Sequence, residues 1–383
     1  MKAEELIKLI PEEDLEFLSV TTGVDFQTKK LFGSVIFKLI LFSMLNPTKL
    51  SFRVMENIIL SASFINFIGF KVETKYNSIR DRICNIDVSF FEQLFNKIFK
   101  IYNNQLKEEK ALIKTDSTYV AIASKLVKWN MHNGRKNTSK NQIKYSVNLK
   151  GSLPCGFKIF TNKEYISEDL ALSETISENI HTDESIVVFD RGLKSRKKLD
   201  ELTNQHIQFI TRISPNTVVQ IVQKNKLKKS VETETLIINE DLKVKLQDRR
   251  KVFTTNSYRV IKAQMKHSGE PISFLTNDFK LTTEEVTVLY KQRWEIEVFF
   301  KFLKQHLNLS HLISRNEKAI QVILFMTMIL AILILAYKKL NNIKGYKIAK
   351  LKFEIDLDNA MIRQIVILSG GNPDKVGYLW NTS

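Results

Sequence analysis

One apolar stretch constrains the fold of this chain more than any other feature. From Ile320 to Tyr337 the chain reads IQVILFMTMILAILILAY, which is apolar over roughly 17 residues, the lower limit for a membrane-spanning helix. The stretch closely follows a charged helical segment, and no second hydrophobic segment accompanies it. A helix that is apolar all round is expected in the centre of a large domain. We therefore predict a buried core helix, with a membrane anchor through 320–337 as the alternative.

The charged segment at 290–304, YKQRWEIEVFFKFLK, is amphipathic at helical period. Because each helical residue turns by about 100°, Glu297 shares an arc of roughly 80° with Tyr290, Arg293, Lys301 and Lys304. Glu295 falls on the opposite side. The pattern predicts one helix with an apolar inner face and an outer face that offers a carboxylate among cations, suited to a metal ion and a polyanion. The alternative is a surface helix with i,i+4 ion pairs, worth only tenths of a kcal/mol.

The charge balance favours a polyanionic partner. There are 58 Lys and Arg against 41 Asp and Glu, a formal net charge of +17, and nucleic acid is the first candidate for such a chain. The alternative is a generally basic protein. The two cysteines, Cys84 and Cys155, form no disulfide or metal-binding pattern, and the N-terminus has no long apolar segment of a signal peptide. We expect a cytoplasmic location.

The order of helical and strand-like patterns predicts a mixed α/β (α+β) protein. We expect a helical N-terminal DNA-binding domain at 1–108, for which a purely structural helical cap is the alternative. Strand-like and helical runs then predict the first part of an α/β core at 109–204 and a β-rich insertion at 205–283. Core helices follow at 284–340, and the tail at 341–383 could serve dimerisation.

Two aspartates stand in or after strand-like runs. Asp116 lies in KTDST, and Asp190 follows the apolar run SIVVF; an acid at the carboxyl end of a buried strand is where open α/β sheets place functional groups. Each could instead stabilise a turn or a helix N-terminus. Together with Glu297, however, they offer oxygen ligands for two divalent metal ions, which can promote in-line phosphoryl transfer.

Taken together, these motifs resemble those of DDE transposases of the bacterial insertion-sequence-four family. The helix motif of that family, Y-x2-R-x3-E-x6-K, is matched by Tyr290, Arg293, Glu297 and Lys304. The sequence DST at 116–118, the sequence FDRG at 189–192 and the β-rich segment between Asp190 and Glu297 also match. The resemblance covers about 110–335.

The resemblance implies an RNase H-like catalytic core in which Asp116, Asp190 and Glu297 bind two Mg²⁺ or Mn²⁺ ions. It implies that Tyr290, Arg293 and Lys304 hold DNA, and that the enzyme cuts element ends, often through a hairpin, and joins the 3′ ends to target DNA as a dimer. One departure concerns the tryptophan that some members stack on a flipped base from the insertion, since none occurs here. The candidate substitutes are Tyr258, His267, Phe274 and Trp294.

Further cations are candidates for binding DNA. The segment 124–144 reads SKLVKWNMHNGRKNTSKNQIK and contains no acid. As a predicted loop it could grip phosphates and stack a base on Trp129, or it could simply be solvated. Lys301 and Trp294 on the helix, and Arg191 after Asp190, are further candidates. The candidates in the predicted loop are Lys125, Lys128, Arg135, Lys136, Lys140 and Lys144.

These patterns together predict an active DNA transposase. A transposase-derived protein that binds DNA ends without cutting them is the main alternative, and a membrane-anchored protein is the second.

Overall fold

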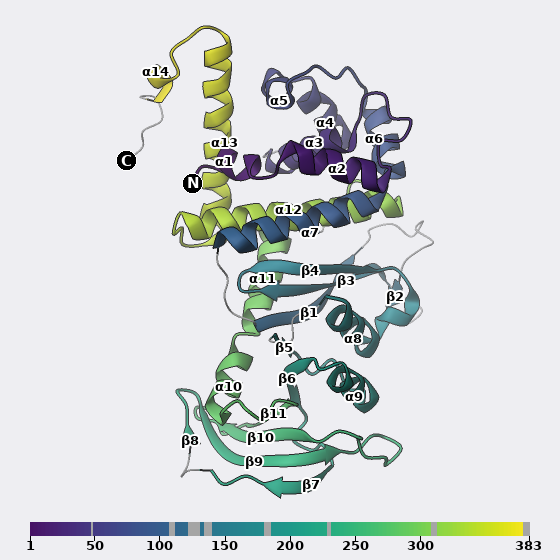
Figure 1. Cartoon of the computed structure of the whole chain (residues 1–383), viewed down its shortest axis with the longest axis vertical. Coiled ribbons are helices and arrows are strands. Elements are labelled where there is room, and N and C mark those ends of the chain that lie inside the picture. The colour runs from purple at the N-terminus through teal and green to yellow at the C-terminus, as the bar shows by residue number, and fades with distance from the viewer. Residues whose placement is uncertain are drawn as a thin grey trace. The chain divides into compact units, whose positions relative to one another are not determined.

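The chain divides into two compact units (Figure 1). One comprises Met1–Lys107 with Phe302–Ser383, and the other comprises Glu108–Lys301. The computed structural model describes residues 1–46, 49–106, 112–121, 131–133, 140–179, 185–227, 231–307 and 312–377.

The unit Glu108–Lys301 is built on five core strands in the order β4–β3–β1–β5–β6. β1 pairs antiparallel with β3 and parallel with β5, and β5 pairs parallel with β6. Parallel neighbours need crossover connections, which α8 (Glu168–Asn179) and α9 (Arg196–Asn204) supply. This order confirms the expected α/β class with an RNase H-like core. The strands are β1 (Leu112–Ala121), β3 (Lys140–Lys150), β4 (Leu153–Phe160), β5 (Ile186–Phe189) and β6 (Gln208–Ile213).

The insertion strands continue the same sheet. β11 pairs antiparallel with β6, and the order then runs β11–β10–β9–β7. β8 pairs with β9 beside this path, and β2 pairs with β3 at the opposite edge. The sheet therefore carries the insertion directly beside the core. These strands are β2 (Met131–Asn133), β7 (Val219–Lys224), β8 (Val231–Glu232), β9 (Leu236–Leu246), β10 (Tyr258–Met265) and β11 (Pro271–Thr276).

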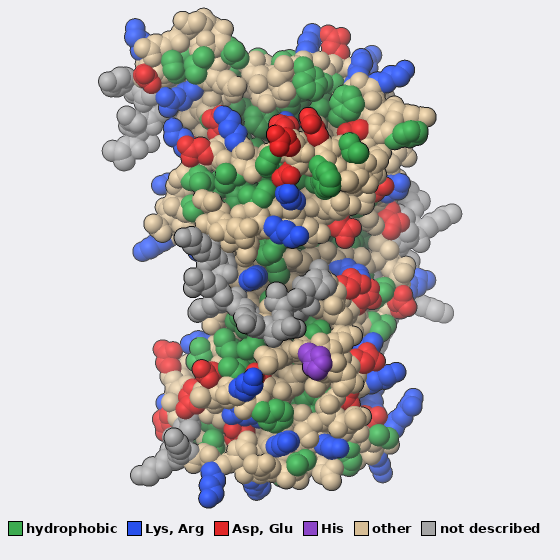
Figure 2. Space-filling view, in the orientation of Figure 1, with side chains coloured by type: hydrophobic (Ala, Val, Ile, Leu, Met, Phe, Trp, Pro, Cys, Tyr) green, Lys and Arg blue, Asp and Glu red, His purple; other side chains and the backbone are tan. Residues whose placement is uncertain are grey.

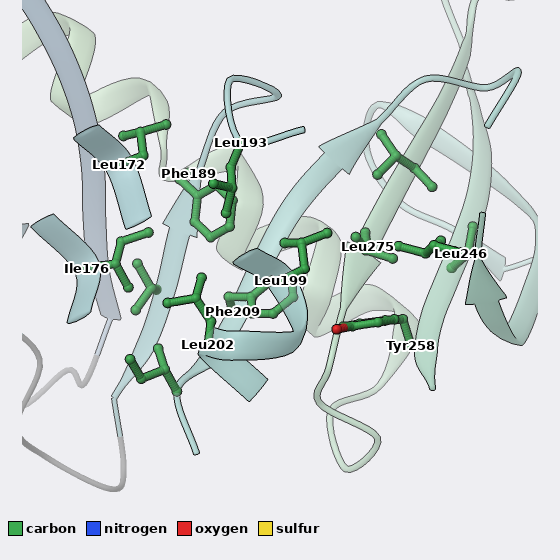
Figure 3. Packing of buried hydrophobic residues seen from close by; sticks show 14 of the residues in the cluster. Leu172, Ile176, Phe189, Leu193, Leu199, Leu202, Phe209, Leu246, Tyr258 and Leu275 are labelled. Atoms are coloured by element: carbon green, nitrogen blue, oxygen red, sulfur yellow. The ribbon is translucent and has the colours of Figure 1, made fainter. Parts of the chain in front are cut away.

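A hydrophobic cluster fixes the two crossover helices to the sheet (Figure 3). Leu199 and Leu202 of α9 lie beside Phe189 of β5 and Phe209 of β6, whose ring centroids are 5.6 Å apart. All four side chains are buried. Truncating one such aromatic residue to alanine typically costs about 3–5 kcal/mol, so this packing holds the end of β5, and Asp190 after it, in place.

The other unit is helical, and its central helix is α12 (Glu317–Leu340). Every residue from Ile320 to Tyr337 except Gln321 is buried, and α12 packs against α7 and α13 (Figure 1). Asn316 caps its first turn by accepting a hydrogen bond from Ala319 N at 3.0 Å. The prediction of a buried core helix is therefore confirmed. Although α12 is long and apolar enough to cross a membrane, 94% of its most apolar window is buried by protein.

The remaining helices of this unit are mostly short. The expected segment 284–340 is divided between the two units. Its residues up to Lys301 belong to the unit Glu108–Lys301, while α12 belongs to the helical unit, where it packs against α7. The helices are α1 (Ala3–Lys8), α2 (Glu12–Thr22), α3 (Gly33–Leu45), α4 (Phe52–Ile59), α5 (Ala62–Ile68), α6 (Tyr76–Asn85), α7 (Val88–Leu106), α13 (Tyr346–Leu368) and α14 (Asp374–Gly377).

The charged segment at 290–304 is not one continuous helix. α10 (Thr283–Lys291) ends just before Gln292, and α11 (Trp294–His306) begins two residues later. Between them Arg293 N donates to Tyr290 O at 3.0 Å and Ile296 N donates to Arg293 O at 3.1 Å. These i→i+3 bonds tighten the backbone. The expectation that Tyr290 shares one helix face with Glu297 is therefore wrong, because Tyr290 belongs to α10.

Candidate active site

The sheet brings the two candidate aspartates to neighbouring positions. Thr115 of β1 is in register with Phe189 of β5. Asp116 directly follows Thr115, and Asp190 directly follows Phe189. Asp116 Oδ1 accepts a hydrogen bond from Ser117 N at 2.7 Å. This register puts the two acids at adjacent positions in the sheet.

The sequence FDRG forms a turn that depends on its glycine. Asp190 Oδ1 accepts a hydrogen bond from Gly192 N at 2.7 Å. A Cβ atom at position 192 would lie 2.7 Å from Asp190 Oδ1 and 3.2 Å from a methyl group of Leu172. Only glycine therefore fits without a shift. Thr211 Oγ1 of β6 also donates to Asp190 O at 2.8 Å, which ties this turn to the sheet.

Arg293 connects Asp116 to Glu297. Its Nη1 atom lies 3.7 Å from Asp116 Oδ2, and its Nη2 atom donates to Glu297 Oε1. The Arg293–Glu297 pair is the i,i+4 pair expected from sequence. The contact of Arg293 with Asp116, by contrast, joins residues far apart in the sequence and results from the fold.

The electrostatics of this site favour a bound cation. Burial raises the pKa of Asp116 to about 7, and the neighbouring charge of Asp190 adds to the shift. Arg293 and the hydrogen bond from Ser117 N oppose it. A raised pKa means that the ionised form lacks sufficient compensation. Two crowded carboxylates with oxygen donors therefore fit a divalent cation such as Mg²⁺.

The third carboxylate does not complete a ligand set in this arrangement. Among the residues that the structure describes, no three His, Cys, Asp or Glu side chains lie near enough together to hold one metal ion. Glu297 is instead paired with Arg293. Asp116 and Asp190 thus form the part of the expected triad that suits a metal, and Glu297 is connected to it through a guanidinium group.

Tyr290 lies beside the site from α10. Its ring packs edge-on against Phe274 of β11, with centroids 5.3 Å apart. Burial raises the pKa of the Tyr290 hydroxyl, while Arg293 and Arg212 oppose that shift. Two cations are therefore close to this hydroxyl, in a place where a phosphate could lie.

Sequence reasoning missed two cations that matter here. Arg212 of β6 has an Nε atom that is buried without a hydrogen-bond partner among the described residues. Lys114 of β1 is 2% exposed and donates to Glu295 Oε2 and Gly151 O, each at 2.7 Å, which anchors the first turn of α11. Nothing in the local sequence distinguishes these cations from solvated ones.

The structure sorts the candidates for base stacking. Tyr258 is fully buried in the cluster of Figure 3 and donates to Asp200 Oδ1 at 2.7 Å, and Phe274 is buried against Tyr290. Neither can stack on a base. Trp294, whose exposed fraction is 63%, and His267 are accessible. The accessible ring that directly adjoins Arg293 is therefore that of Trp294.

The basic segment at 124–144 is only partly described. Lys125, Lys128, Arg135 and Lys136, together with Trp129, lie outside the described residues. The expectation that Lys144 belongs to a loop is wrong, because it lies in β3, is fully buried and pairs with Glu168 at 2.8 Å. Lys140 also belongs to β3.

Three DNA-binding candidates have exposed side chains. Arg191 follows Asp190, and Lys301 and Lys304 lie on α11. Lys304 follows Glu297 by seven residues, which is close to two helical turns. These side chains remain candidates for contact with a phosphate backbone.

The comparisons with known proteins agree with these features. Residues 108–334 match the family model described as "Transposase DDE domain". A probable transposase for insertion sequence element IS5377 from Geobacillus stearothermophilus is 25% identical over 263 residues, which cover 68% of this chain and 66% of that protein. A putative transposase for insertion sequence element IS4SA from Synechocystis sp. is 28% identical over 256 residues, covering 65% and 67%.

A third relative is about as similar to this chain as the first two, and one solved structure is less similar in sequence. The putative transposase y4zB from Sinorhizobium fredii is 25% identical over 258 residues, covering 67% of this chain and 69% of that protein. The match therefore spans about two thirds of each relative's length. A piggyBac transposase in a synaptic complex with hairpin DNA has a TM-score of 0.49 at 10% identity, covering 95% of this chain and 82% of that one, too low a similarity to carry an argument. Because the family model matches more than half of the chain, the chain belongs to the family defined by the transposase DDE domain.

Proposed function

We propose that this protein is a DNA transposase that binds the ends of an insertion sequence, cleaves them and joins the 3′ ends to target DNA. One observation carries the proposal. Asp116 and Asp190 lie close together, Arg293 approaches Asp116 and pairs with Glu297, and all four residues fall within the transposase DDE domain. Its partners are the terminal inverted repeats and target DNA, in a homodimer that brings two ends together. Its location is the bacterial cytoplasm, with the nucleoid.

The three carboxylates are proposed as the ligands of two Mg²⁺ or Mn²⁺ ions. Such ions, when bound, activate the attacking oxygen and stabilise the leaving oxygen of an in-line displacement. The protein's part is to hold Asp116 and Asp190 in register on β1 and β5 and to supply Glu297 from α11. The raised pKa of Asp116 supports this assignment.

Arg293 is proposed to change partners when DNA binds. A guanidinium group binds a phosphate through two parallel hydrogen bonds. A DNA phosphate can therefore replace the carboxylates of Asp116 and Glu297 as its partner. Those carboxylates would then be free to act as metal ligands.

The surrounding residues are proposed to hold the DNA. Tyr290 and Arg293 contact the phosphate nearest the carboxylates, while Lys301, Lys304 and Arg191 contact the backbone. Trp294 supplies an exposed ring on which a base can stack. Lys125, Lys128, Arg135 and Lys136 are proposed as further backbone contacts.

The decisive experiment is a cleavage assay on the DNA that flanks the gene for this chain. We expect cuts at the inverted-repeat ends with Mg²⁺ and none with EDTA. Glu297→Gln should reduce cleavage by more than about a thousandfold, the scale of several kcal/mol of lost metal stabilisation, and should leave end binding largely intact. Cleavage by this variant at the wild-type rate would exclude Glu297 from the site.

The matched control is Glu234→Gln. Glu234 is also an acid paired with a cation, since its Oε2 atom lies 3.1 Å from Lys291 Nζ, but its side chain is 85% exposed and far less constrained. We expect this variant to cut normally. A loss equal to that of Glu297→Gln would show that any charge change in this region impairs cleavage.

A DNA-binding protein that no longer cuts is the second candidate function. The observation in its favour is that the described residues form no three-ligand metal site. Specific end binding with no cut, at any Mg²⁺ or Mn²⁺ concentration, would establish it. Membrane anchoring through 320–337 is tested by fractionation, and firm retention in membranes after a high-salt wash would overturn the transposase proposal.

A further inference from the structure

A basic groove adjoins the candidate active site within the unit Glu108–Lys301. Its volume is about 910 Å³, and Asp190 is one of the residues that line it. One wall is the turn after β5 and the start of α9, with Arg191, Lys194 and Arg196. The opposite wall is the turn between β9 and β10, with Arg249 and Arg250. We use the name basic groove for this cleft.

The lining of the basic groove is strongly cationic. Seven of its eighteen residues are Arg or Lys, and three are Asp. In Figure 2, Lys and Arg side chains are also frequent over the insertion strands on the face shown. A cleft lined by one sign of charge focuses the field and attracts ligands of the opposite charge.

Each of the three acids holds the backbone of a cationic wall. Asp190 Oδ1 accepts from Gly192 N at 2.7 Å, and Asp169 Oδ1 accepts from Ser195 N at 2.6 Å and from Lys194 N. Asp248 Oδ1 accepts from Arg250 N and from Val252 N, each at 2.8 Å. These carboxylates therefore fix the turns from which the cations project.

Except for Lys197, whose Nζ lies 4.0 Å from Glu201 Oε1, the cations of the groove have no ion-pair partner among the described residues. None of Arg191, Lys194, Arg196, Arg249 and Arg250 forms an ion pair within 4.0 Å with a described residue. Burial also lowers the pKa of the Arg196 guanidinium, which Asp169 only partly opposes. A partly desolvated cation without an ion-pair partner is costly, so Arg196 in particular is suited to receive acceptors from a ligand, and the exposed cations around it are open to the same ligand.

We propose that the basic groove holds the sugar–phosphate backbone of the substrate DNA where it continues past the cut, with Arg249 and Arg250 as its far contact. This inference rests on the proposed function, because it is the presence of Asp190 in the lining of the groove that identifies the ligand. The scissile phosphate lies at the carboxylates in that function, so the strand enters the groove at Asp190. The insertion thereby acts in binding DNA.

The first test measures how DNA affinity depends on salt. The probes are a labelled duplex of about 30 base pairs and arbitrary sequence, and one strand of it, in EDTA so that no cutting occurs, over roughly 50–200 mM salt. Because each lost phosphate contact lowers the slope of log K against log salt by about 0.9 on duplex DNA, we expect Arg249→Gln/Arg250→Gln to lower it by up to about 1.8. Both side chains are exposed, so the variant should fold.

The matched control removes two cations from the same sheet but outside the groove. Lys262 pairs with Glu240 and Lys266 pairs with Glu232, and neither lines the groove. Lys262→Gln/Lys266→Gln changes the net charge equally and should leave the slope unchanged. A further variant on the other wall, Lys194→Gln, should lower it by about 0.9.

The second test locates the groove relative to the cut. Once the cut position is mapped with wild-type protein, duplexes are made that stop at the cut on one side or the other. The effect of Arg249→Gln/Arg250→Gln should disappear on one of these two duplexes and persist on the other.

The outcomes separate the two proposals. If wild-type protein neither binds nor cuts DNA, the proposed function itself fails. If wild-type protein binds and cuts, but the groove variant and the Lys262/Lys266 control give the same slope, only the groove proposal is overturned. A groove effect that persists on both shortened duplexes overturns it as well.

Discussion

Two sets of cations in the unit Glu108–Lys301 differ in burial and in ion pairing. The cations inside the sheet are buried and paired, as Arg259 is with Asp241 at 2.7 Å and Lys114 is with Glu295 at 2.7 Å. Those of the basic groove, apart from Lys197, whose Nζ lies 4.0 Å from Glu201 Oε1, have no such partner among the described residues. Because an unpaired buried charge is destabilising, the first set is there for stability, and the second is available to a ligand.

The largest expected effect lies in the buried pair of the insertion. Arg259 is 7% exposed and Asp241 is 5% exposed, so Arg259→Met leaves a buried carboxylate without a cation and with only the hydrogen bond from Asn225 Nδ2 at 3.0 Å. We expect a loss of about 3–5 kcal/mol in the free energy of unfolding, measured by urea denaturation.

The double variant Asp241→Leu/Arg259→Met sharpens this test. Replacing both members of a buried ion pair by apolar side chains is often neutral or stabilising, so it should recover much of the loss. If the single variant costs no more than a surface substitution, the assignment of this cation to stability is wrong.

A smaller effect is expected at Lys114. Its partner Glu295 has a side chain that is 55% exposed, so water can replace the lost cation. Lys114→Met should cost about 1–3 kcal/mol, mainly because Gly151 O loses its hydrogen bond. Urea denaturation of Lys114→Met and Arg259→Met, measured side by side, gives the difference between their losses in the free energy of unfolding. Equal losses would show that the exposure of the partner carboxylate does not determine how much stability is lost.

The sequence predicted those parts of the site that depend on local patterns. The apolar run before Asp190 indicated a buried strand with an acid at its end, and the i,i+4 spacing indicated the Arg293–Glu297 pair. The run from Ile320 to Tyr337 indicated a helix buried on all sides. In each case the pattern is local in the sequence, where period and spacing are sufficient.

What the sequence could not predict depends on contacts between distant residues. Lys114 finds Glu295 181 positions away, and no local signal separates such a buried lysine from a solvated one. The break between α10 and α11 falls among residues that all tolerate a helix. Arg249 and Arg250, from the β9–β10 turn, line the same groove as the loop after β5, although their positions in the sequence are more than fifty residues apart.

The smallest effect on stability is expected in the basic groove, where it tests the comparison most directly. Arg196 is partly buried, and no described residue forms an ion pair with it, so Arg196→Gln should change the free energy of unfolding by no more than about 0.5 kcal/mol. The same substitution should lower the slope of log K against log salt for duplex DNA by about 0.9. Urea denaturation and the salt series together measure both quantities on one variant. A destabilisation as large as that of Arg259→Met, with an unchanged slope, would place Arg196 among the structural cations, because its charge would then be stabilised by the protein and not by DNA.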